Sequence, residues 1–383
     1  MSAIARLERE LKDAPDKADA RLRAFVARHD LPLREGRTAT FLFYDGQPAE
    51  SVHLVHWVYG LESRQPLQRL ADSQAFVLQL DLPETARVEY KYEVLRGGQA
   101  TWLRDPQNQR QAFDPFGSNS VCPMPGYQAP PWVQREPHVR RGRLESFVLR
   151  SAAYGDERPI VVYLPHEFRP QKHYPLLICH DGSDYRRYAS IVAILDNLVH
   201  WHEVKPLMVA FTDGVHRNRE YGADPRQPAL LVDELLPAIT ARFGVSTNPE
   251  ELGLMGASFG GVSSLYTAWH RPGVFGRLLL QSGSFVFTDV GHHGRGPLWD
   301  PVVDFVNAYR LDPGRVRART YMSCGRFESL ISFNRGLVPQ MRRAGLELRF
   351  SESDDGHNWI CWRDRLREGL TWLFPGYLWM VYD

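Results

Sequence analysis

The segment Gly256-Ala257-Ser258-Phe259-Gly260 constrains the fold of this chain more than any other. It follows an apolar run that ends at Leu254-Met255, and it precedes a run with helical spacing from Val262 to His270. This context predicts a strand, a sharp turn and a helix, with Ser258 at the turn. Glycine permits the tight turn, which exposes the serine hydroxyl beyond the end of the strand. The alternative is a chance match to a short pattern, but the strand before it and the helix after it favour a nucleophile elbow.

The second half of the chain alternates between strand-like and helix-like runs. The predicted strands are residues 145–150, 160–164, 176–179, 207–212, 252–255, 278–281, 320–324 and 346–351. The predicted helices are residues 190–202, 229–243, 262–270, 301–309, 333–343 and 363–373. Two opening strands followed by strands and helices in alternation indicate an α/β protein. Because the elbow follows the fifth of eight strands, we predict an α/β-hydrolase domain over residues 144–383.

The first half of the chain has a different periodicity. Residues 1–36 are predicted to form a helical segment, because their apolar residues recur on one helical face. Apolar and polar residues then alternate, most clearly over residues 88–94. Short strands separated by turn residues predict a β-sandwich over residues 37–130, and this sandwich resembles an Ig-like (early-set) domain. A proline-rich and then basic stretch, residues 131–143, is the predicted linker.

The composition argues against several classes of protein. Lys and Arg total 46 and Asp and Glu total 45, so a net charge of +1 gives no overall attraction to nucleic acid or anionic membranes. No apolar run is long enough for a membrane span, and the first residues lack the apolar core of a secretory signal. The four cysteines form no C-x-x-C pair, which favours buried free thiols. We therefore expect a cytoplasmic protein with a small-molecule partner; its oligomeric state is not indicated.

Chain order identifies two residues as candidate catalytic partners of Ser258. A serine hydroxyl is a good nucleophile only when a neighbouring base takes its proton. Because catalytic groups lie beyond the carboxyl ends of the strands, the acid should follow the seventh strand and the histidine the eighth. Glu328 and His357 hold these positions, as the acid that orients the imidazole and as the general base. The alternatives are structural roles for both, Asp354 or Asp355 as the acid, or a serine–histidine dyad.

The oxyanion hole is expected to use two backbone N–H groups. One belongs to Phe259, the residue after the nucleophile, and the other to the loop at residues 180–185 after the third predicted strand. Within this loop Gly182 lets the backbone approach closely, and Ser183 is the expected donor. The alternative is an ordinary Asp-Gly turn.

Taken together, these motifs resemble the enterochelin (enterobactin) esterases, from about residue 38 to about residue 375. In the first half the resemblance is carried by Asp105-Pro-Gln-Asn108 and by Asp114-Pro-Phe-Gly-Ser-Asn-Ser-Val121. In the second half it is carried by Asp181-Gly182, Arg217-Asn-Arg219-Glu220, Leu235-Leu236-Pro237, Gly256-x-Ser258-x-Gly260-Gly261 and Gly356-His357-Asn-Trp-Ile-Cys-Trp362-Arg363.

The resemblance implies that ester bonds of a ferric catecholate siderophore are opened through an acyl-serine intermediate. Ser258 would be the nucleophile, His357 the base and Glu328 the acid, and iron would belong to the substrate and not to a cofactor of the enzyme. The strongly anionic substrate implies a cationic pocket, for which the candidates are His216, Arg217, Arg219 and Arg295. The alternative for these residues is a solvated charged loop. The histidines at 292 and 293 lack a third ligand at suitable spacing, so no metal site is predicted.

One departure from the family concerns the residues before His357. Relatives usually carry glycine where this chain has Asp355, and Asp354 adds a second carboxylate. Two carboxylates near an anionic ligand would oppose its binding by roughly 1 kcal/mol per exposed pair. Two other functions therefore stay open. One is a serine esterase of the same fold for an acetyl, feruloyl or peptide ester, and the other is a non-catalytic binding protein whose sandwich recognises the ligand.

Overall fold

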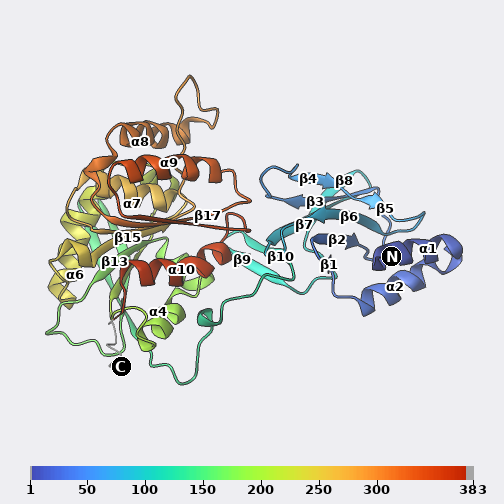
Figure 1. Cartoon of the computed structure of the whole chain (residues 1–383), viewed down its shortest axis with the longest axis horizontal. Coiled ribbons are helices and arrows are strands. Elements are labelled where there is room, and N and C mark those ends of the chain that lie inside the picture. The colour runs from blue at the N-terminus through green and yellow to red at the C-terminus, as the bar shows by residue number, and fades with distance from the viewer. Residues whose placement is uncertain (1, 377–383) are drawn as a thin grey trace. The chain divides into compact units, whose positions relative to one another are not determined.

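The structure is a computed structural model that describes residues 2–376. The chain divides into two compact units. Unit 1 comprises Met1–Ala129 together with two short segments from much later in the chain, Gly325–Glu328 and Ser353–Asn358. Unit 2 comprises Pro130–Cys324, Ser329–Glu352 and Trp359–Asp383. Both are drawn as ribbons in Figure 1.

Unit 1 consists of two helices and two antiparallel sheets. The helices are α1 (Ala3–Asp13) and α2 (Ala18–Arg28). One sheet has the strand order β1-β2-β6-β5, and the other has the order β4-β3-β7-β10-β9 with β8 paired to β7. The strands are β1 Leu33–Glu35, β2 Thr38–Phe43, β3 Ser51–His56, β4 Arg64–Pro66, β5 Gln68–Arg69, β6 Phe76–Asp81, β7 Arg87–Arg96, β8 Gln99–Leu103, β9 Gln111–Asp114 and β10 Gly117–Pro123.

Strand β2 buries side chains on both of its faces, and this explains the layers of unit 1. Phe41 and Phe43 pack into the core between the two sheets, where Tyr90 and Tyr92 of β7 also lie. Leu42, on the opposite face of β2, belongs to a second core formed with α1 and α2. Successive strand residues point to opposite faces, so a strand covered on both sides buries successive side chains, here including Thr40. The predicted sandwich is present, with a pair of helices covering one of its outer faces.

The segment predicted as helical, residues 1–36, contains α1 and α2 but ends in a strand. Leu33 and Glu35 of β1 pair with Thr40 and Thr38 of β2 in an antiparallel register. A three-residue strand carries too little periodicity to be distinguished from the end of a helix in the sequence. Ser2 caps α1 by accepting a hydrogen bond from the backbone N–H of Ala5.

Unit 2 contains a single eight-stranded sheet with the order β11-β12-β14-β13-β15-β16-β17-β18. All eight predicted strands are present, and counted one to eight they follow the spatial order 1-2-4-3-5-6-7-8. The first two pairings, β11 with β12 and β12 with β14, are antiparallel, and the pairings from β14 through β17 are parallel. The strands are β11 Arg143–Ser151, β12 Asp156–Leu164, β13 Leu176–His180, β14 Met208–Thr212, β15 Leu252–Ala257, β16 Arg277–Gln281, β17 Arg319–Gly325 and β18 Leu348–Ser353.

Helices cover both faces of this sheet (Figure 1). One face packs against α6, α7, α8 and α9, and the other against α3, α4 and α10. Along β13 the side chains alternate, with Leu176 and Ile178 in the first core and Leu177 and Cys179 in the second. This is the predicted α/β-hydrolase architecture. The helices are α3 Gly182–Tyr188, α4 Ile191–His200, α5 Arg217–Tyr221, α6 Leu236–Phe243, α7 Phe259–His270, α8 Asp300–Leu311, α9 Ile331–Arg343 and α10 Trp359–Leu373.

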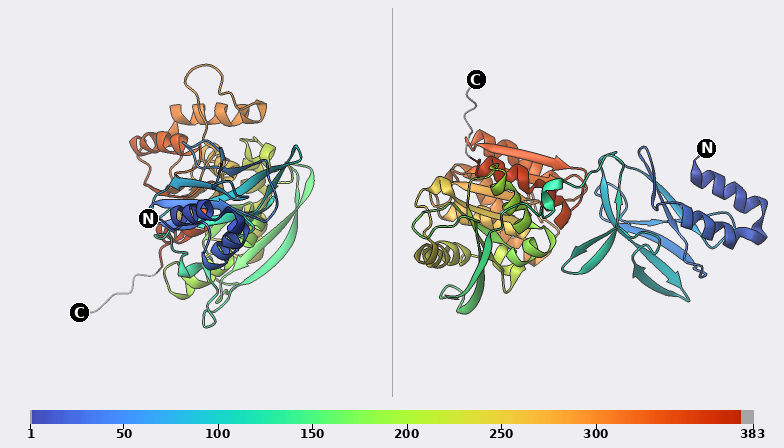
Figure 2. Two further views of the ribbon diagram at one scale, coloured as in Figure 1. Left: turned by 90° about the vertical axis from the view of Figure 1, so that its right-hand side faces the viewer. Right: turned by 90° about the horizontal axis from the view of Figure 1, so that it is seen from below.

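Shorter helical turns complete the chain. A π-helical turn, Ala229–Leu235, precedes α6, so the single helix predicted over residues 229–243 has two parts. Each of the short 3₁₀ turns begins with proline, whose fixed φ suits the first helical position. These turns are Pro15–Lys17, Pro131–Val133, Pro249–Glu251, Pro297–Trp299 and Pro313–Arg315. Figure 2 shows the ribbon from two further directions.

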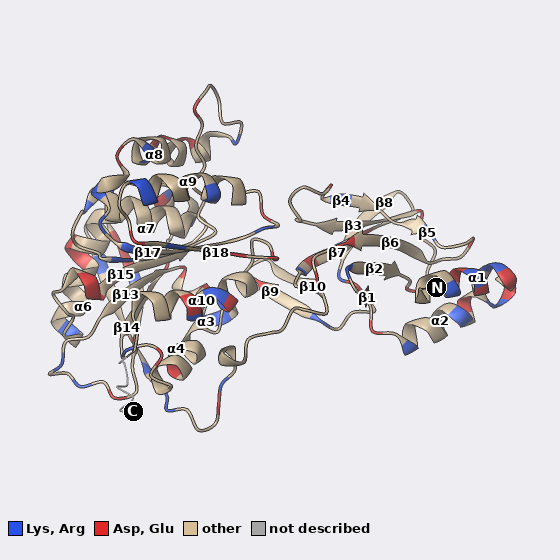
Figure 3. Ribbon diagram, in the orientation of Figure 1, with Lys and Arg blue, Asp and Glu red and all other residues tan. Residues whose placement is uncertain are grey.

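The charges lie mainly outside the central strands. Strands β13, β14 and β15 contain no Lys, Arg, Asp or Glu, whereas α1 and α10 carry both signs of charge (Figure 3). Within residues 2–376, no helix combines the length and the apolar character that a membrane crossing requires.

Candidate active site

Ser258 lies at a strained turn between β15 and α7. Its backbone has φ 57° and ψ −122°, which is a sparsely populated conformation for a residue with a side chain. Hydrogen bonds hold the turn on both sides: the Ser258 N–H donates to the Gln281 carbonyl at 2.9 Å, and the Ser258 carbonyl accepts from Ser284 N–H at 3.1 Å. The strand, sharp turn and helix predicted from the sequence are all present.

The glycines on either side of Ser258 lie where neighbouring atoms leave no room for a side chain. A Cβ atom at Gly256 would come within 2.4 Å of the Gly260 carbonyl carbon. A Cβ atom at Gly260 would come within 3.2 Å of the His180 Cβ. Larger side chains at these positions would push the first turn of α7 away from the ends of β15 and β13.

The Ser258 hydroxyl has a neighbour that the sequence analysis did not identify. Its Oγ lies 3.1 Å from the Oγ of Ser284, a buried residue in the loop after β16. The signal in the sequence was the segment Gln281-Ser282-Gly283-Ser284, which places small hydroxyl residues directly after the sixth strand. Phe259 is the first residue of α7, so its N–H is one of those that a helix leaves without an intrahelical acceptor.

The loop predicted to complete the oxyanion hole begins a helix, α3. Asp181 adopts the left-handed conformation with φ 53°, and Gly182 then starts the helix. Gly182 passes so close to β14 that a Cβ atom there would lie 2.4 Å from the Cβ of Phe211. The N–H of Ser183, the expected donor, already donates to Asp213 Oδ1 at 3.1 Å, and its hydroxyl donates to the same oxygen. With the Ser183 N–H engaged in this way, Gly182 is the residue of this loop that remains as a candidate donor.

His180, at the end of β13, is a histidine of unit 2 that lies beside the elbow. Its ring is fully buried against Tyr221, and neither ring nitrogen has a hydrogen-bond partner. Burial lowers the pKa of His180 to about 3, and Arg217 adds to this shift. A histidine that stays neutral and enclosed is poorly suited to exchange protons with a substrate.

Glu328 and His357 form a direct pair within unit 1. The Glu328 Oε2 lies 2.6 Å from His357 Nδ1, and the Glu328 Oε1 accepts a hydrogen bond from the Gly325 N–H at 2.8 Å. The carboxylate side chain is 3% exposed, whereas the imidazole is 35% exposed. A carboxylate that binds Nδ1–H fixes the ring tautomer and leaves Nε2 to accept a proton.

The two rival acids are used differently. Asp354 pairs with Arg326 at 2.9 Å and accepts a hydrogen bond from the Thr85 hydroxyl. Asp355 is buried and lies 3.3 Å from the Nη1 of Arg87. Burial raises the pKa of Asp355 to about 6, and Arg87 opposes the shift. Asp355 is therefore enclosed and paired with a cation, while the expectation that the two carboxylates before His357 oppose an anionic ligand stays a prediction.

The predicted cationic residues divide into two groups. Arg217 donates to both carboxylate oxygens of Asp181 at 2.6 Å, and Arg295 lies over the rings of Trp299 and Phe333. His216 and Arg219 are exposed on and beside α5.

Helix α5 itself is anchored by a buried ion pair. Glu220 accepts a hydrogen bond from Arg158 Nη1 at 2.6 Å and another from the backbone N–H of His216 at 2.8 Å. The acidic residue in this segment therefore has a structural role, and it holds His216 at the start of the helix.

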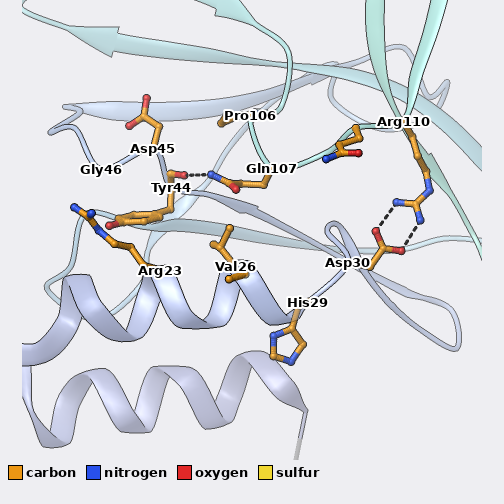
Figure 4. Close-up of a pocket in the computed structure, with 12 residues that line it drawn as sticks. Arg23, Val26, His29, Asp30, Tyr44, Asp45, Gly46, Pro106, Gln107 and Arg110 are labelled. Carbon is orange, nitrogen blue, oxygen red and sulfur yellow. Dashed lines mark hydrogen bonds and ion pairs between the residues drawn. The ribbon is translucent and has the colours of Figure 1, made fainter.

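A separate hollow of about 970 Å³ lies in unit 1, between α2 and loops of the sandwich (Figure 4). Its polar groups are already engaged: Arg110 pairs with Asp30 at 2.6 Å, and the Gln107 amide donates to the Tyr44 carbonyl at 2.8 Å. Since these groups satisfy one another, the hollow offers no evident catalytic or anion-binding group. Across residues 2–376 no cluster of three His, Cys, Asp or Glu side chains could hold a metal ion.

Comparisons with known proteins agree with this architecture. The sequence model of the Esterase family matches residues 151–373. The iron(III) enterobactin esterase of Escherichia coli O6:H1 (strain CFT073) is 29% identical over 203 residues, which are 51% of this chain and 48% of that protein. An endo-1,4-beta-xylanase/feruloyl esterase of Xylanibacter ruminicola is 22% identical over 253 residues, 62% of this chain and 32% of that protein. The chain spans about half the length of the curated enterobactin esterases that it matches.

Among solved structures, the ferric enterobactin esterase of Salmonella typhimurium has a TM-score of 0.72 at 21% identity. The match covers 89% of this chain and 95% of that one, and it shows that the fold is shared. The family model covers more than half of the 383 residues. The chain therefore belongs to the Esterase family.

Proposed function

We propose that this protein is a serine esterase that hydrolyses the ester bonds of a ferric catecholate siderophore. The observation that carries the proposal is the buried Glu328 carboxylate bound to Nδ1 of His357. These residues follow β17 and β18, in the chain order serine, acid, histidine that an α/β-hydrolase requires. The strained turn at Ser258 supports the same conclusion, because the nucleophile of this fold stands on such a turn.

The reaction would proceed in two halves. His357 Nε2 takes the proton from Ser258 as Oγ attacks the ester carbonyl, and the N–H groups of Phe259 and Gly182 bind the resulting oxyanion. The tetrahedral intermediate collapses, and His357 returns the proton to the departing alkoxide. Water then attacks the acyl-serine with the same base. Glu328 stays ionised throughout and stabilises the imidazolium.

The substrate class is supported by similarity and by the side chains around α5. The iron(III) enterobactin esterase of Escherichia coli is one of the relatives to which this chain is similar in sequence. His216 and Arg219 are exposed, so they can attract an anionic iron complex. Asp355 is buried and lies 3.3 Å from the Nη1 of Arg87, so it presents little exposed charge to such a ligand.

A feruloyl or related ester is the second candidate substrate. The specific observation in its favour is the match to the feruloyl esterase of Xylanibacter ruminicola, which extends over 62% of this chain. Both candidates use the same catalytic residues, so only substrate turnover separates them.

The deciding experiment compares ferric enterobactin, iron-free enterobactin, ethyl ferulate and p-nitrophenyl acetate with the full chain, and identifies the products by mass. Ser258→Ala should reduce turnover by on the order of 10⁴-fold or more, because the nucleophile is lost. Ser332→Ala, at an exposed serine on α9, is the matched control and should retain full activity.

Labelling by a fluorophosphonate gives an independent readout at the same serine. The wild-type chain should form an adduct at Ser258, and Ser258→Ala should not. A wild-type chain that forms no adduct and turns over none of the esters would identify a binding protein on a hydrolase fold.

A further inference from the structure

Arg87, the first residue of β7, is a buried arginine in a sandwich strand. Its side chain is 4% exposed, and its guanidinium faces Asp355 at 3.3 Å and Glu89 at 2.8 Å. A third contact joins its Nη1 to the Oδ1 of Asn358 at 3.2 Å. Arginine is rarely buried unless it is paired, because removing the charge from water is expensive. Two of its three partners belong to Ser353–Asn358, the segment that carries His357.

Asp355 lies two residues before His357 in the sequence, and Asn358 directly follows it. Asp355 Oδ1 accepts hydrogen bonds from the Gly356 N–H and from the Asn358 side-chain amide, each at 2.7 Å. Arg87 contacts both of these side chains, so one guanidinium closes a ring of hydrogen bonds around the turn that presents the imidazole.

Backbone contacts also hold the turn that carries His357 against β7 and against the segment that carries Glu328. The Arg87 N–H donates to the Asp354 carbonyl at 2.9 Å. The Asp355 carbonyl accepts from Phe327 N–H at 3.0 Å, one residue before Glu328. A Cβ atom at Gly325 would lie 2.3 Å from that same carbonyl oxygen, so the acid-bearing and base-bearing segments touch directly. All of these groups belong to unit 1.

We propose that Arg87 is a positioning residue for the catalytic base: through Asp355 and Asn358 it fixes the turn that aims the His357 ring. This inference rests on the proposed esterase function. It assigns a role in the reaction to a residue of the sandwich, more than 260 positions away in sequence from the histidine that it serves. Arg87 contacts neither substrate nor reacting atoms in this role, and its effect passes through the turn.

The test replaces Arg87 with methionine in the full chain. Arg87→Met keeps an unbranched side chain but removes the cation and its donors. We expect kcat for p-nitrophenyl acetate to fall on the order of 10²-fold, as a displacement of about 1 Å in a catalytic group can produce. KM should change by less than about threefold, because binding groups are untouched. Fluorophosphonate labelling of Ser258 should slow by a factor similar to that for kcat.

Two further variants separate positioning from general stability. Arg96→Met lies on the same strand and removes a partly exposed ion pair with Asp45, so it should leave kcat unchanged. Arg87→Lys keeps a cation near Asp355 and should recover part of the lost kcat. If Arg87→Met is too unstable to purify, the test rests on Arg87→Lys, for which we expect a lowered kcat and an unchanged KM.

A double-mutant cycle tests the route through Asp355. If Arg87 acts through this carboxylate, adding Asp355→Asn to Arg87→Met should lower kcat little further than Arg87→Met alone. Folded Arg87→Met with normal kcat and labelling would overturn the proposal, as would fully additive losses in the double variant.

An NMR readout keeps this inference separate from the proposed function. The Nδ1 proton of His357, hydrogen-bonded to Glu328, should give a strongly downfield signal in the wild type that weakens or shifts in Arg87→Met and not in Arg96→Met. If the wild type proves inactive on every ester, the proposed function fails, and an unchanged His357 signal in Arg87→Met would then overturn the positioning role as well.

Discussion

At the scale of single residues, the three acids near His357 have distinct environments. Glu328 is buried against the imidazole, Asp354 pairs with Arg326, and Asp355 pairs with Arg87. The sequence left these acids as alternatives, because Glu328 follows the seventh predicted strand whereas Asp354 and Asp355 lie just before His357. Burial and partner geometry distinguish them.

Removing the charge from Glu328 should impair catalysis with little effect on folding. Glu328→Gln retains the shape of the side chain, but the amide does not stabilise the imidazolium and can hold the wrong ring tautomer. We expect kcat to fall by roughly 10²–10⁴-fold, measured on p-nitrophenyl acetate. The control is Glu352→Gln on β18, which removes a carboxylate that pairs with Arg335 of α9. A loss of less than about threefold in Glu328→Gln would point to a serine–histidine dyad.

Asp355 should make stability depend on pH in a predictable direction. Burial raises its folded-state pKa from 3.8 to about 6, so the native state favours the protonated carboxyl. Its contribution to stability is therefore complete below pH 4 and is lost as the pH rises through about 6, by about 3 kcal/mol at most. Asp355→Asn carries no titrating group at this site. Relative to the wild type, its free energy of unfolding should rise between pH 4 and pH 7.

The measurement is urea denaturation of both proteins across this pH range. Other titrating groups are shared, so they cancel in the difference between the two proteins. A difference that stays constant from pH 4 to pH 7 would contradict a raised pKa at Asp355.

At the scale of elements, the elbow depends on how closely β15, α7 and β13 approach one another. Gly256 and Gly260 have no positive φ, so they are needed for space and not for backbone freedom. Ser258 is the residue that adopts the unusual backbone conformation. The glycine pattern in the sequence therefore marks positions near Ser258 where neighbouring segments approach too closely for a side chain.

Gly256→Ala should destabilise the protein, because its new methyl group would meet the backbone of Gly260 at 2.4 Å. We expect the free energy of unfolding to fall by about 1–3 kcal/mol or more, as overpacking in a rigid site does. Gly314→Ala is the matched control: a Cβ atom there meets nothing within 4 Å, and its φ is not positive. Urea denaturation midpoints give the comparison, and equal midpoints for Gly256→Ala and the wild type would refute the steric argument.

At the scale of the whole molecule, local patterns in the sequence were sufficient to predict the fold class. Eight strands and the elbow could be predicted because hydrophobic period and glycine spacing are short-range signals. The segment after β13 was predicted as a loop but forms α3, and the N–H of Ser183 is bound to Asp213, thirty positions later. Short strands such as β1 and β5 carry too few residues to show a period.

The candidate site was predicted less completely than the fold. Strand order placed Glu328 and His357 after neighbouring strands, and the structure joins them, while their catalytic roles stay predictions. Ser284 and Arg87 were not identified. The partner of Arg87 lies 268 positions away, and no periodicity in a single sequence connects such distant residues.

The grouping of Gly325–Glu328 and Ser353–Asn358 with the N-terminal sandwich has a consequence for protein engineering. Anyone who transplants the hydrolase half onto a new scaffold would carry Ser258, Glu328 and His357, yet leave behind Arg87, whose guanidinium and backbone N–H hold the turn that carries the imidazole. A working chimera would have to supply substitutes for both.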